Sequence, residues 1–120
     1  MNLIKLDISG NAIKFFPKSL PMKNFTSLKL LYLHDNAMED IESLYNIFET
    51  PNLRYLTLFN NPISQKWSLR HFIVNSMRSL FALDFYSIAD EERMESATKT
   101  ERFYALSPST KITWPIVSKS

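Results

Sequence analysis

One pattern of leucines, closed by an asparagine, recurs in this chain at a fixed interval of 25 residues. Each copy has the form Leu-x-x-Leu-x-Leu-x-x-Asn, with isoleucine as the last apolar residue of the first copy. The copies span 3–11, 28–36 and 53–61, and they end on Asn11, Asn36 and Asn61. A repeat of this length is typical of a solenoid, in which successive coils of the chain stack on one another.

Apolar residues alternate along each copy, and this periodicity is typical of a β-strand. The inward positions of the three predicted strands are Leu6, Ile8, Leu31, Leu33, Leu56 and Leu58. A short strand cannot bury its inner face alone, so the stacked copies are expected to form a curved parallel sheet on the concave side of an α/β solenoid. A fourth strand is expected at 80–85, where the leucine spacing recurs after 27 residues.

The asparagines are expected to close the coils. The chain must turn sharply after each strand, which leaves backbone groups without sheet partners, and a side-chain amide offers both donors and an acceptor for them. Asn11, Asn36 and Asn61 are therefore predicted to form a ladder of hydrogen bonds. The ladder is expected to stop at Ile88, which takes the asparagine position of the fourth copy, because terminal repeats depart from the pattern.

The segments between the strands are expected to return on the convex side. Pro17, Pro21 and Pro51 argue against long helices in the first two return segments. The third return segment differs, because 64–78 contains neither proline nor glycine. Its apolar spacing predicts a helix of about three turns.

Residues 1–92 are thus expected to form the repeats and a C-terminal cap. A charged helix is expected over 93–106, after the acids at 90–92, which suit the first turn of a helix. A Ser-Pro sequence then breaks the helix, and 107–120 is expected as a tail that either docks on the body or hangs loose.

The composition excludes several classes of function. Cysteine is absent from the 120 residues, so neither a disulfide framework nor a cysteine metal site is available, and a cytoplasmic location is favoured. The single glycine, Gly10, cannot build a phosphate-binding glycine loop. A net charge of +2 is too balanced to indicate nucleic-acid binding. No apolar run reaches the roughly 18 residues that a membrane span requires.

A catalytic or metal site is not expected either. His34 and His71 are the only histidines, and they belong to different faces of the predicted solenoid, whereas a metal site needs convergent ligands. Ser9, Asp7 and His34 fall on adjacent strands, but an open sheet has no pocket that excludes water. We therefore expect no enzyme activity and no cofactor.

The three copies in register resemble the leucine-rich repeat family, in its short intracellular form. The resemblance extends over about 3–92, and the segment from Asn61 through 69–74 to the acids at 90–92 looks like the C-terminal cap of such proteins. The stretch 70–75, with Leu83-Asp84 and the acids, is also similar to leucine-rich repeat proteins that carry an IQ motif elsewhere. No IQ motif occurs in these 120 residues.

This resemblance implies protein–protein recognition, with partners such as phosphatases or cytoskeletal and ciliary assemblies. The alternative is a structural or capping piece of a larger regulatory scaffold. The first copy begins at Leu3, which leaves no room for an N-terminal cap. An uncapped solenoid exposes a strand edge, so we expect the chain to belong to a longer protein or complex.

The outward strand positions point to a partner-binding surface on the concave face. Aromatic residues gather there toward the C-terminal half of the predicted sheet: Tyr32, His34, Tyr55, Phe59 and Tyr86. Exposed aromatic clusters are typical of binding hot spots. The alternative is that these rings are covered by one another or by the tail.

A second hypothesis concerns calmodulin, which binds helices with spaced apolar anchors. Trp67, Val74 and Leu80 have such a spacing beside basic residues within 66–81. The same apolar residues are needed to pack the convex side, however, so burial in the core is the favoured interpretation.

Overall fold

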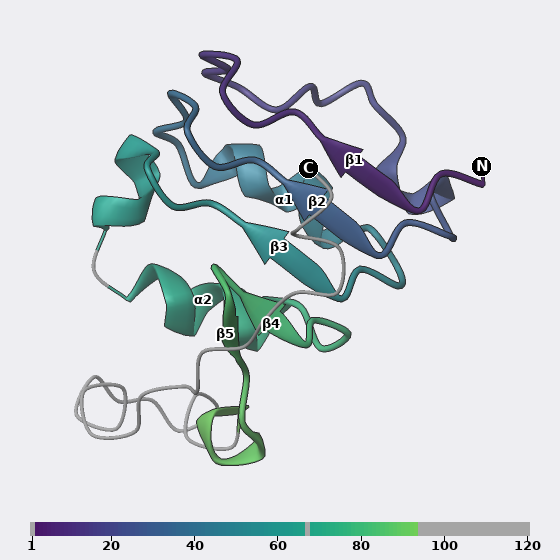
Figure 1. Cartoon of the computed structure of the whole chain (residues 1–120), viewed down its shortest axis with the longest axis vertical. Coiled ribbons are helices and arrows are strands. Elements are labelled where there is room, and N and C mark those ends of the chain that lie inside the picture. The colour runs from purple at the N-terminus through teal and green to yellow at the C-terminus, as the bar shows by residue number, and fades with distance from the viewer. Residues whose placement is uncertain (1, 67, 94–120) are drawn as a thin grey trace.

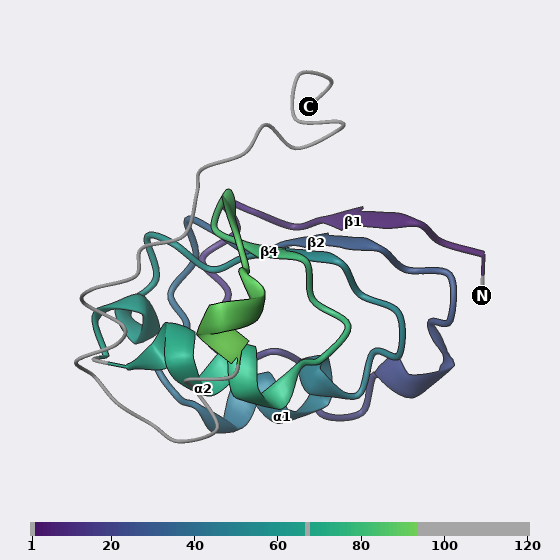
Figure 2. The same ribbon diagram turned by 90° about the horizontal axis from the view of Figure 1, so that it is seen from below.

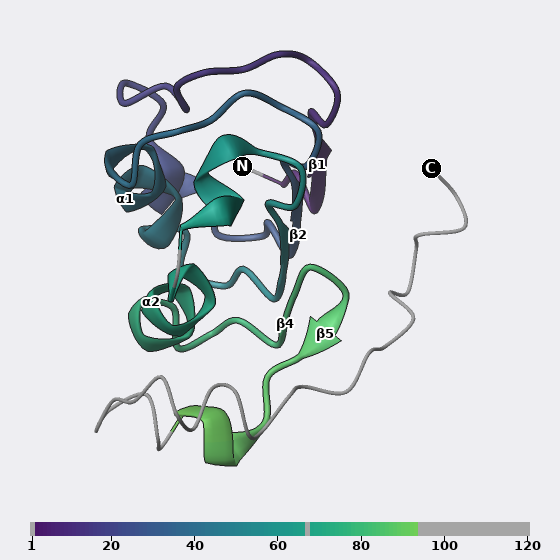
Figure 3. The ribbon, with the colours of Figure 1, turned by 90° about the vertical axis from the view of Figure 1, so that its left-hand side faces the viewer.

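The computed structural model describes residues 2–66 and 68–93. These residues form stacked coils in two layers, with the strands in one layer and the short helices in the other (Figures 1 and 2). Figure 3 shows the same division from the side, with α1 and α2 opposite the strands. No helix in this part of the chain is long and apolar enough to cross a bilayer.

The strand layer is one sheet with the order β1-β2-β3-β4-β5. Its strands are β1 (Lys5–Asp7), β2 (Leu30–Tyr32), β3 (Tyr55–Thr57), β4 (Ala82–Leu83) and β5 (Tyr86–Ser87). The first four are parallel, and equivalent leucines stand in register, since Leu6 pairs with Leu31 and Leu31 with Leu56. The predicted α/β solenoid with a parallel sheet is confirmed.

The fourth predicted strand is wrong in its extent. Instead of one strand over 80–85, β4 and β5 form an antiparallel hairpin, which makes five strands rather than about four. Asp84 and Phe85 form the two-residue turn, with φ of 53° and 71°. Positive φ at both central residues is the geometry of tight hairpin turns, but it is uncommon for a bulky residue such as Phe85.

The return segments contain the helical elements. These are the 3-10 helices η1 (Met22–Asn24) and η2 (Pro62–Gln65) and the α-helices α1 (Glu42–Phe48) and α2 (Leu69–Ser76). The helix predicted over 64–78 is therefore shorter than expected. Extended backbone at Lys66 and a φ of 64° at Ser68 separate η2 from α2, so the segment cannot form one continuous helix.

The core lies between the two layers. Leu31, Leu33, Leu56 and Leu58 are completely buried there, whereas the equivalent residues of β1 are only partly buried. This difference arises because β1 has a neighbouring coil on one side only among the described residues. Each fully buried leucine contributes about 1.5–3 kcal/mol to the free energy of unfolding.

Asparagine side chains bridge neighbouring coils by accepting hydrogen bonds. The Oδ1 atom of Asn36 accepts from the backbone N–H groups of Asn11 (2.8 Å) and Ile13 (3.0 Å) in the preceding coil. Asn61 repeats the arrangement with the N–H of Met38 at 3.0 Å.

The same side chains also donate hydrogen bonds across the coils. The Nδ2 atom of Asn36 donates to the carbonyl of Ile8 at 3.1 Å, and that of Asn61 donates to the carbonyl of Leu33 at 3.0 Å. Asn11 is exposed, and its Nδ2 donates within its own coil, to Ile8 and Ser9. Asn36 and Asn61 therefore each join their own coil to the preceding one.

A left-handed residue precedes each of these asparagines. Gly10, Asp35 and Asn60 have φ of 72°, 58° and 57°. Glycine, aspartate and asparagine are the residues that adopt this conformation most readily, so the sequence supplies a suitable residue at each turn.

Asp84 bonds the fourth coil to the third at the position where Thr57 bonds the third coil to the second. Its carboxylate accepts hydrogen bonds from the backbone N–H groups of Leu58 (2.6 Å) and Phe59 (3.1 Å). The hairpin turn directs this side chain toward the backbone that follows β3. Burial raises the pKa of the Asp84 carboxyl, although the two backbone N–H groups act in the opposite direction.

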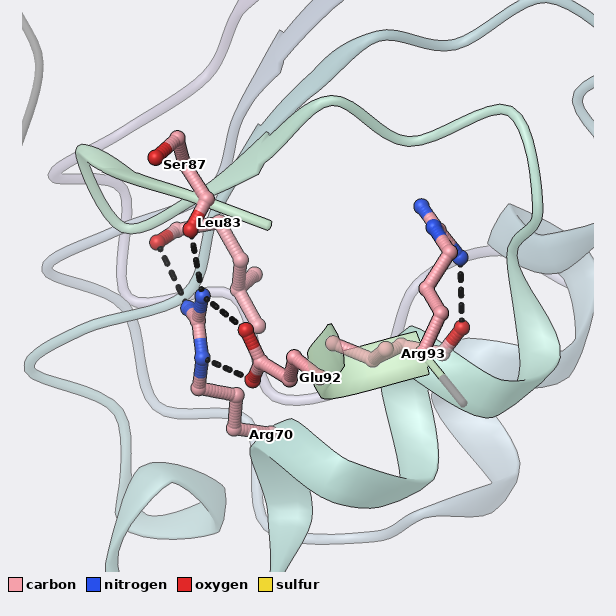
Figure 4. A network of polar contacts seen from close by, with 6 residues as sticks. Arg70, Leu83, Ser87, Glu92 and Arg93 are labelled. Carbon is pink, nitrogen blue, oxygen red and sulfur yellow. Dashed lines mark hydrogen bonds and ion pairs between the residues drawn. The ribbon is translucent and has the colours of Figure 1, made fainter. Parts of the chain in front are cut away.

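An ion pair fastens the C-terminal cap (Figure 4). Arg70 on α2 donates to both carboxylate oxygens of Glu92, at 2.7 and 3.1 Å. The same guanidinium donates to the backbone carbonyls of Leu83 (3.2 Å) and Ser87 (3.0 Å). One side chain therefore connects α2, the hairpin and residues 90–93, which are helical.

Arg93 closes the end of α2. Its guanidinium donates to the carbonyl of Val74, in the last turn of α2, and to those of Met77 and Leu80, which follow the helix. Burial lowers the pKa of Arg93, and nearby Arg78 adds to this shift. The helix predicted over 93–106 and the tail over 107–120 fall outside the described residues, apart from Arg93.

Replacing Asn61 by alanine should destabilise the protein by about 1–3 kcal/mol, because buried backbone groups lose their partners. The exposed Asn11 is the matched control, and Asn11→Ala should cost less than about 0.5 kcal/mol. Urea unfolding followed by circular dichroism measures both values. Equal losses for the two variants would contradict the bridging role of Asn61.

Asp84→Asn should change how the free energy of unfolding depends on pH, because it removes the buried carboxyl group. A raised carboxyl pKa contributes stability that is complete below the unfolded value, 3.8, and is lost as pH rises through the folded pKa. The free energy of unfolding of the wild type should therefore fall, relative to that of Asp84→Asn, between acidic and neutral pH. Urea titrations across this range test the sign, and a difference that grows in favour of the wild type would contradict it.

Arg70→Ala should cost about 3–5 kcal/mol, because it leaves the carboxylate of Glu92 buried without its cation. Glu92 is 2% exposed, so water cannot replace the guanidinium. Arg54→Ala, at an exposed position, is the control and should change the free energy of unfolding by less than about 0.5 kcal/mol. Similar unfolding midpoints for both variants would show that the ion pair does not hold the cap.

Candidate functional site

The outer face of the sheet lies opposite the helices (Figure 2). A small apolar cluster occupies its centre, where Leu30, Tyr32 and Ala82 are buried and Tyr55 and Phe85 pack against them. We refer to this part of the molecule as the concave surface. It is built by side chains from β2, β3, β4 and the hairpin turn, so the stacking of the coils determines its shape.

A chain of rings runs along the concave surface. The ring of Tyr32 lies 5.9 Å from that of His34, and His34 stacks on Phe59 with centroids 4.5 Å apart and planes 10° apart. The ring of Phe59 lies 5.6 Å from that of Phe85. The structure thus brings together Tyr32, His34 and Phe59 from the set predicted by the sequence.

Tyr55 and Tyr86 take different places. Tyr55 makes an edge contact with Phe81, at 5.8 Å and 75°, and also packs against the buried cluster. Tyr86 is 43% exposed on β5 and lines a hollow with Asp84 and Arg70. The sequence therefore identified the correct face for Tyr55, whereas Tyr86 lies beside a separate hollow.

Tyr32 departs from the expectation of an exposed ring. It is only 3% exposed, and burial followed by the charge of Asp7 raises the pKa of its hydroxyl. The Nζ atom of Lys5 lies 5.3 Å from the centre of its ring, which is within reach of a cation–π interaction. Tyr32 therefore lies beneath the concave surface and packs against its exposed side chains. The accessible rings are those of the half-buried residues His34, Tyr55 and Phe59.

Two aromatic residues of this surface escaped the sequence analysis. Phe81 and Phe85 fall within the strand predicted over 80–85 and were not among the residues predicted to bind a partner, but Asp84 and Phe85 form a hairpin turn there. The aspartate at the first turn position was the available signal, because aspartate tolerates positive φ.

Polar contacts hold the ring chain in place. The Nδ1 atom of His34 shares a hydrogen bond of 2.7 Å with the hydroxyl of Thr57, and this hydroxyl also accepts from the N–H of Leu33 at 3.1 Å. Asp7 is engaged by Ser9, whose hydroxyl donates to it at 2.7 Å. Burial raises the pKa of Asp7, but the Ser9 hydrogen bonds together with the charges of His34 and Lys5 lower it, and the net shift is downward.

This arrangement is suited to recognition. His34 is bound to Thr57 and Ser9 is bound to Asp7, so the three groups considered for catalysis do not form a relay. Within the described ranges, no group of three or more His, Cys, Asp or Glu side chains could hold a metal ion. The hollow beside Tyr86 has a volume of about 440 Å³ and mixed polar and apolar walls.

Two of the three anchors of the calmodulin hypothesis are inaccessible in the described part of 66–81. Val74 and Leu80 are almost completely buried in the core, so a partner could reach them only by unfolding the cap. Trp67, the first proposed anchor, lies outside the described residues.

Comparison with known proteins gives a consistent result. The profile of the leucine-rich repeat family matches residues 3–106. Leucine-rich repeat and IQ domain-containing protein 3 of Homo sapiens is 42% identical over 105 residues, which cover 88% of this chain and 17% of that protein. The Mus musculus protein of the same name is 45% identical over 111 residues, with coverages of 89% and 17%. The chain thus spans 17% of the length of these relatives.

More distant proteins share the fold. The U2 small nuclear ribonucleoprotein A′ of Arabidopsis thaliana is 31% identical over 91 residues, which cover 76% of this chain and 33% of that protein. A chain of the Drosophila melanogaster SNF/U2A′ complex superposes with a TM-score of 0.75 at 22% identity, covering 87% of this chain and 60% of that one. The matched repeats, the parallel sheet and the family profile agree, and this chain belongs to the leucine-rich repeat family.

Proposed function

We propose that the concave surface binds a partner protein through its accessible rings. The family and the fold are those of protein–protein interaction modules, which are typically not enzymes. The observation that carries the proposal is the ring chain itself, in which His34, Phe59 and Phe85 stand side by side on one face. Aromatic side chains supply a large contact area at a small cost in conformational entropy, and they are enriched in binding hot spots.

The contacts that order these rings also favour partner binding. The hydrogen bond between Thr57 and His34 holds the imidazole in one orientation, and the stacking of His34 on Phe59 restricts both rings. A surface whose side chains are ordered before binding loses less entropy when a partner docks. The left-handed backbone at Phe85 adds strain that the surrounding contacts maintain, and such strain is common at binding sites.

A photo-crosslinking residue at position 59 should capture a partner that an equivalent residue at position 23 does not. Lys23 lies on η1, in the opposite layer, and is exposed, so it is the matched control. The captured protein should bind the double variant Tyr55→Ala/Phe59→Ala at least about tenfold more weakly, because truncated hot-spot residues cost about 2 kcal/mol or more.

Two results would contradict the proposal. One is equal capture from positions 59 and 23, and the other is unchanged affinity of the double variant. Capture confined to β1 would instead favour the alternative of a structural piece within a larger scaffold. Circular dichroism of the double variant excludes loss of the fold as the cause of weaker binding.

A further inference from the structure

A second group of exposed aromatic rings lies away from the concave surface, in the helical layer. Phe15 is 65% exposed and Tyr45, on α1, is 53% exposed. Large apolar rings in contact with water mark interaction sites when they form a continuous patch with suitable neighbours. The contacts of these two residues show such a patch.

Tyr45 is held by two further rings. Its ring lies 6.2 Å from that of Phe48 on the same helix and 6.4 Å from that of Phe72 on α2, and both contacts are edge-to-face. Phe48 and Phe72 contact each other at 5.5 Å and are half-buried. The tyrosine therefore presents a supported ring to the solvent, across the junction of two helices.

Two hollows connect this ring with Phe15. One has a volume of about 240 Å³ and is lined by Asp40, Glu42 and Tyr45, among others. The other has a volume of about 230 Å³ and is lined by Phe15 and the same two acids. Both are smaller than the roughly 300–1,000 Å³ of small-molecule sites, so each suits a single side chain rather than a whole ligand.

Carboxylates outnumber cations in each hollow. Asp40 and Glu42 line both hollows, whereas Lys18 lines only one of them and Lys66 only the other. Arg70–Glu92 is the ion pair found among the described residues, so neither Asp40 nor Glu42 is paired with a cation there. Lys18 and Lys66 line one hollow each, but they stand beyond ion-pair distance of the two acids.

We propose that this acidic–aromatic strip, formed by Phe15, Asp40, Glu42, Tyr45, Phe48 and Phe72, docks a basic segment of a partner protein. Lysine or arginine side chains of that segment enter the two hollows, where each meets a carboxylate and the edge or face of a ring. Cations are attracted both by carboxylates and by aromatic faces, and the long stems of lysine and arginine cover apolar surface. Apolar side chains of the same segment cover Tyr45 and Phe72.

The strip lies on a different layer from the concave surface, so this proposal is independent of the one above. An acidic segment would be repelled by Asp40 and Glu42, and a purely apolar one would leave both carboxylates without partners. The chemistry of the strip therefore selects a partner that combines positive charge with apolar side chains.

Nuclear magnetic resonance of the isotopically labelled chain tests this proposal with a synthetic amphipathic peptide. The probe is a peptide of about 14 residues, long enough to form a helix, in which lysine and leucine alternate at helical spacing. Its addition should shift the resonances of Phe15, Tyr45 and Phe72, and the shifts should diminish as salt is raised. The analogue in which glutamate replaces lysine should produce no shifts at these positions.

Matched variants separate this site from non-specific attraction. Asp40→Asn/Glu42→Gln should weaken binding of the lysine peptide at least about tenfold, and Tyr45→Ala should have a similar effect. Asp90→Asn/Glu91→Gln removes the same charge at exposed positions elsewhere and should leave the affinity unchanged. The spectra of the free variants report whether each one is folded.

Three results would overturn the proposal: equal binding of the glutamate peptide, equal weakening by the two double variants, or shifts confined to His34, Phe59 and their neighbours. The last result would assign the peptide to the concave surface and would leave the first proposal standing. If instead no partner binds the concave surface while the lysine peptide still shifts the resonances of the acidic–aromatic strip, the first proposal fails and this one stands.

Discussion

The stacking of one coil on the next is the interaction on which the rest of this molecule depends. No strand in the described part is longer than three residues, so a single coil cannot bury its leucines. Parallel pairing of β1 to β4 and the amides of Asn36 and Asn61 hold the coils at a constant spacing. Because equivalent residues of successive repeats then lie above one another, the residues at one position of the repeat form a continuous row across the coils.

The C-terminal end of the stack follows different rules. Asp84 accepts hydrogen bonds from the backbone N–H groups of Leu58 and Phe59, and the chain then reverses into an antiparallel strand. Arg70 then ties the hairpin to α2 and to Glu92. The reversal also positions Phe85 against Phe59, so the element that closes the stack contributes to the concave surface. Termination of the repeat and formation of the site are therefore coupled in this cap.

The two surfaces differ in how their residues reach the solvent. On the concave surface, rings from successive strands align because the register is fixed, and hydrogen bonds such as that between His34 and Thr57 order them. In the helical layer, Tyr45 and Phe72 meet because α1 and α2 lie side by side, although their residues occupy no common column of the repeat. One surface is thus a product of the repeat pattern, and the other is a product of the irregular return segments.

The sequence by itself determined the solenoid, its inward leucines and the face on which His34, Tyr55 and Phe59 lie, because a strict period of 25 residues leaves one way to stack the coils. It could not show that Tyr32 is buried, that the strand predicted over 80–85 is a hairpin, or that the helix predicted over 64–78 is interrupted at Ser68. Those features depend on contacts between residues far apart in the chain and on positive φ angles that phenylalanine and serine adopt only where the surrounding structure imposes them. The tertiary structure alone decided them, since periodicity describes what the coils share and the cap is where they differ.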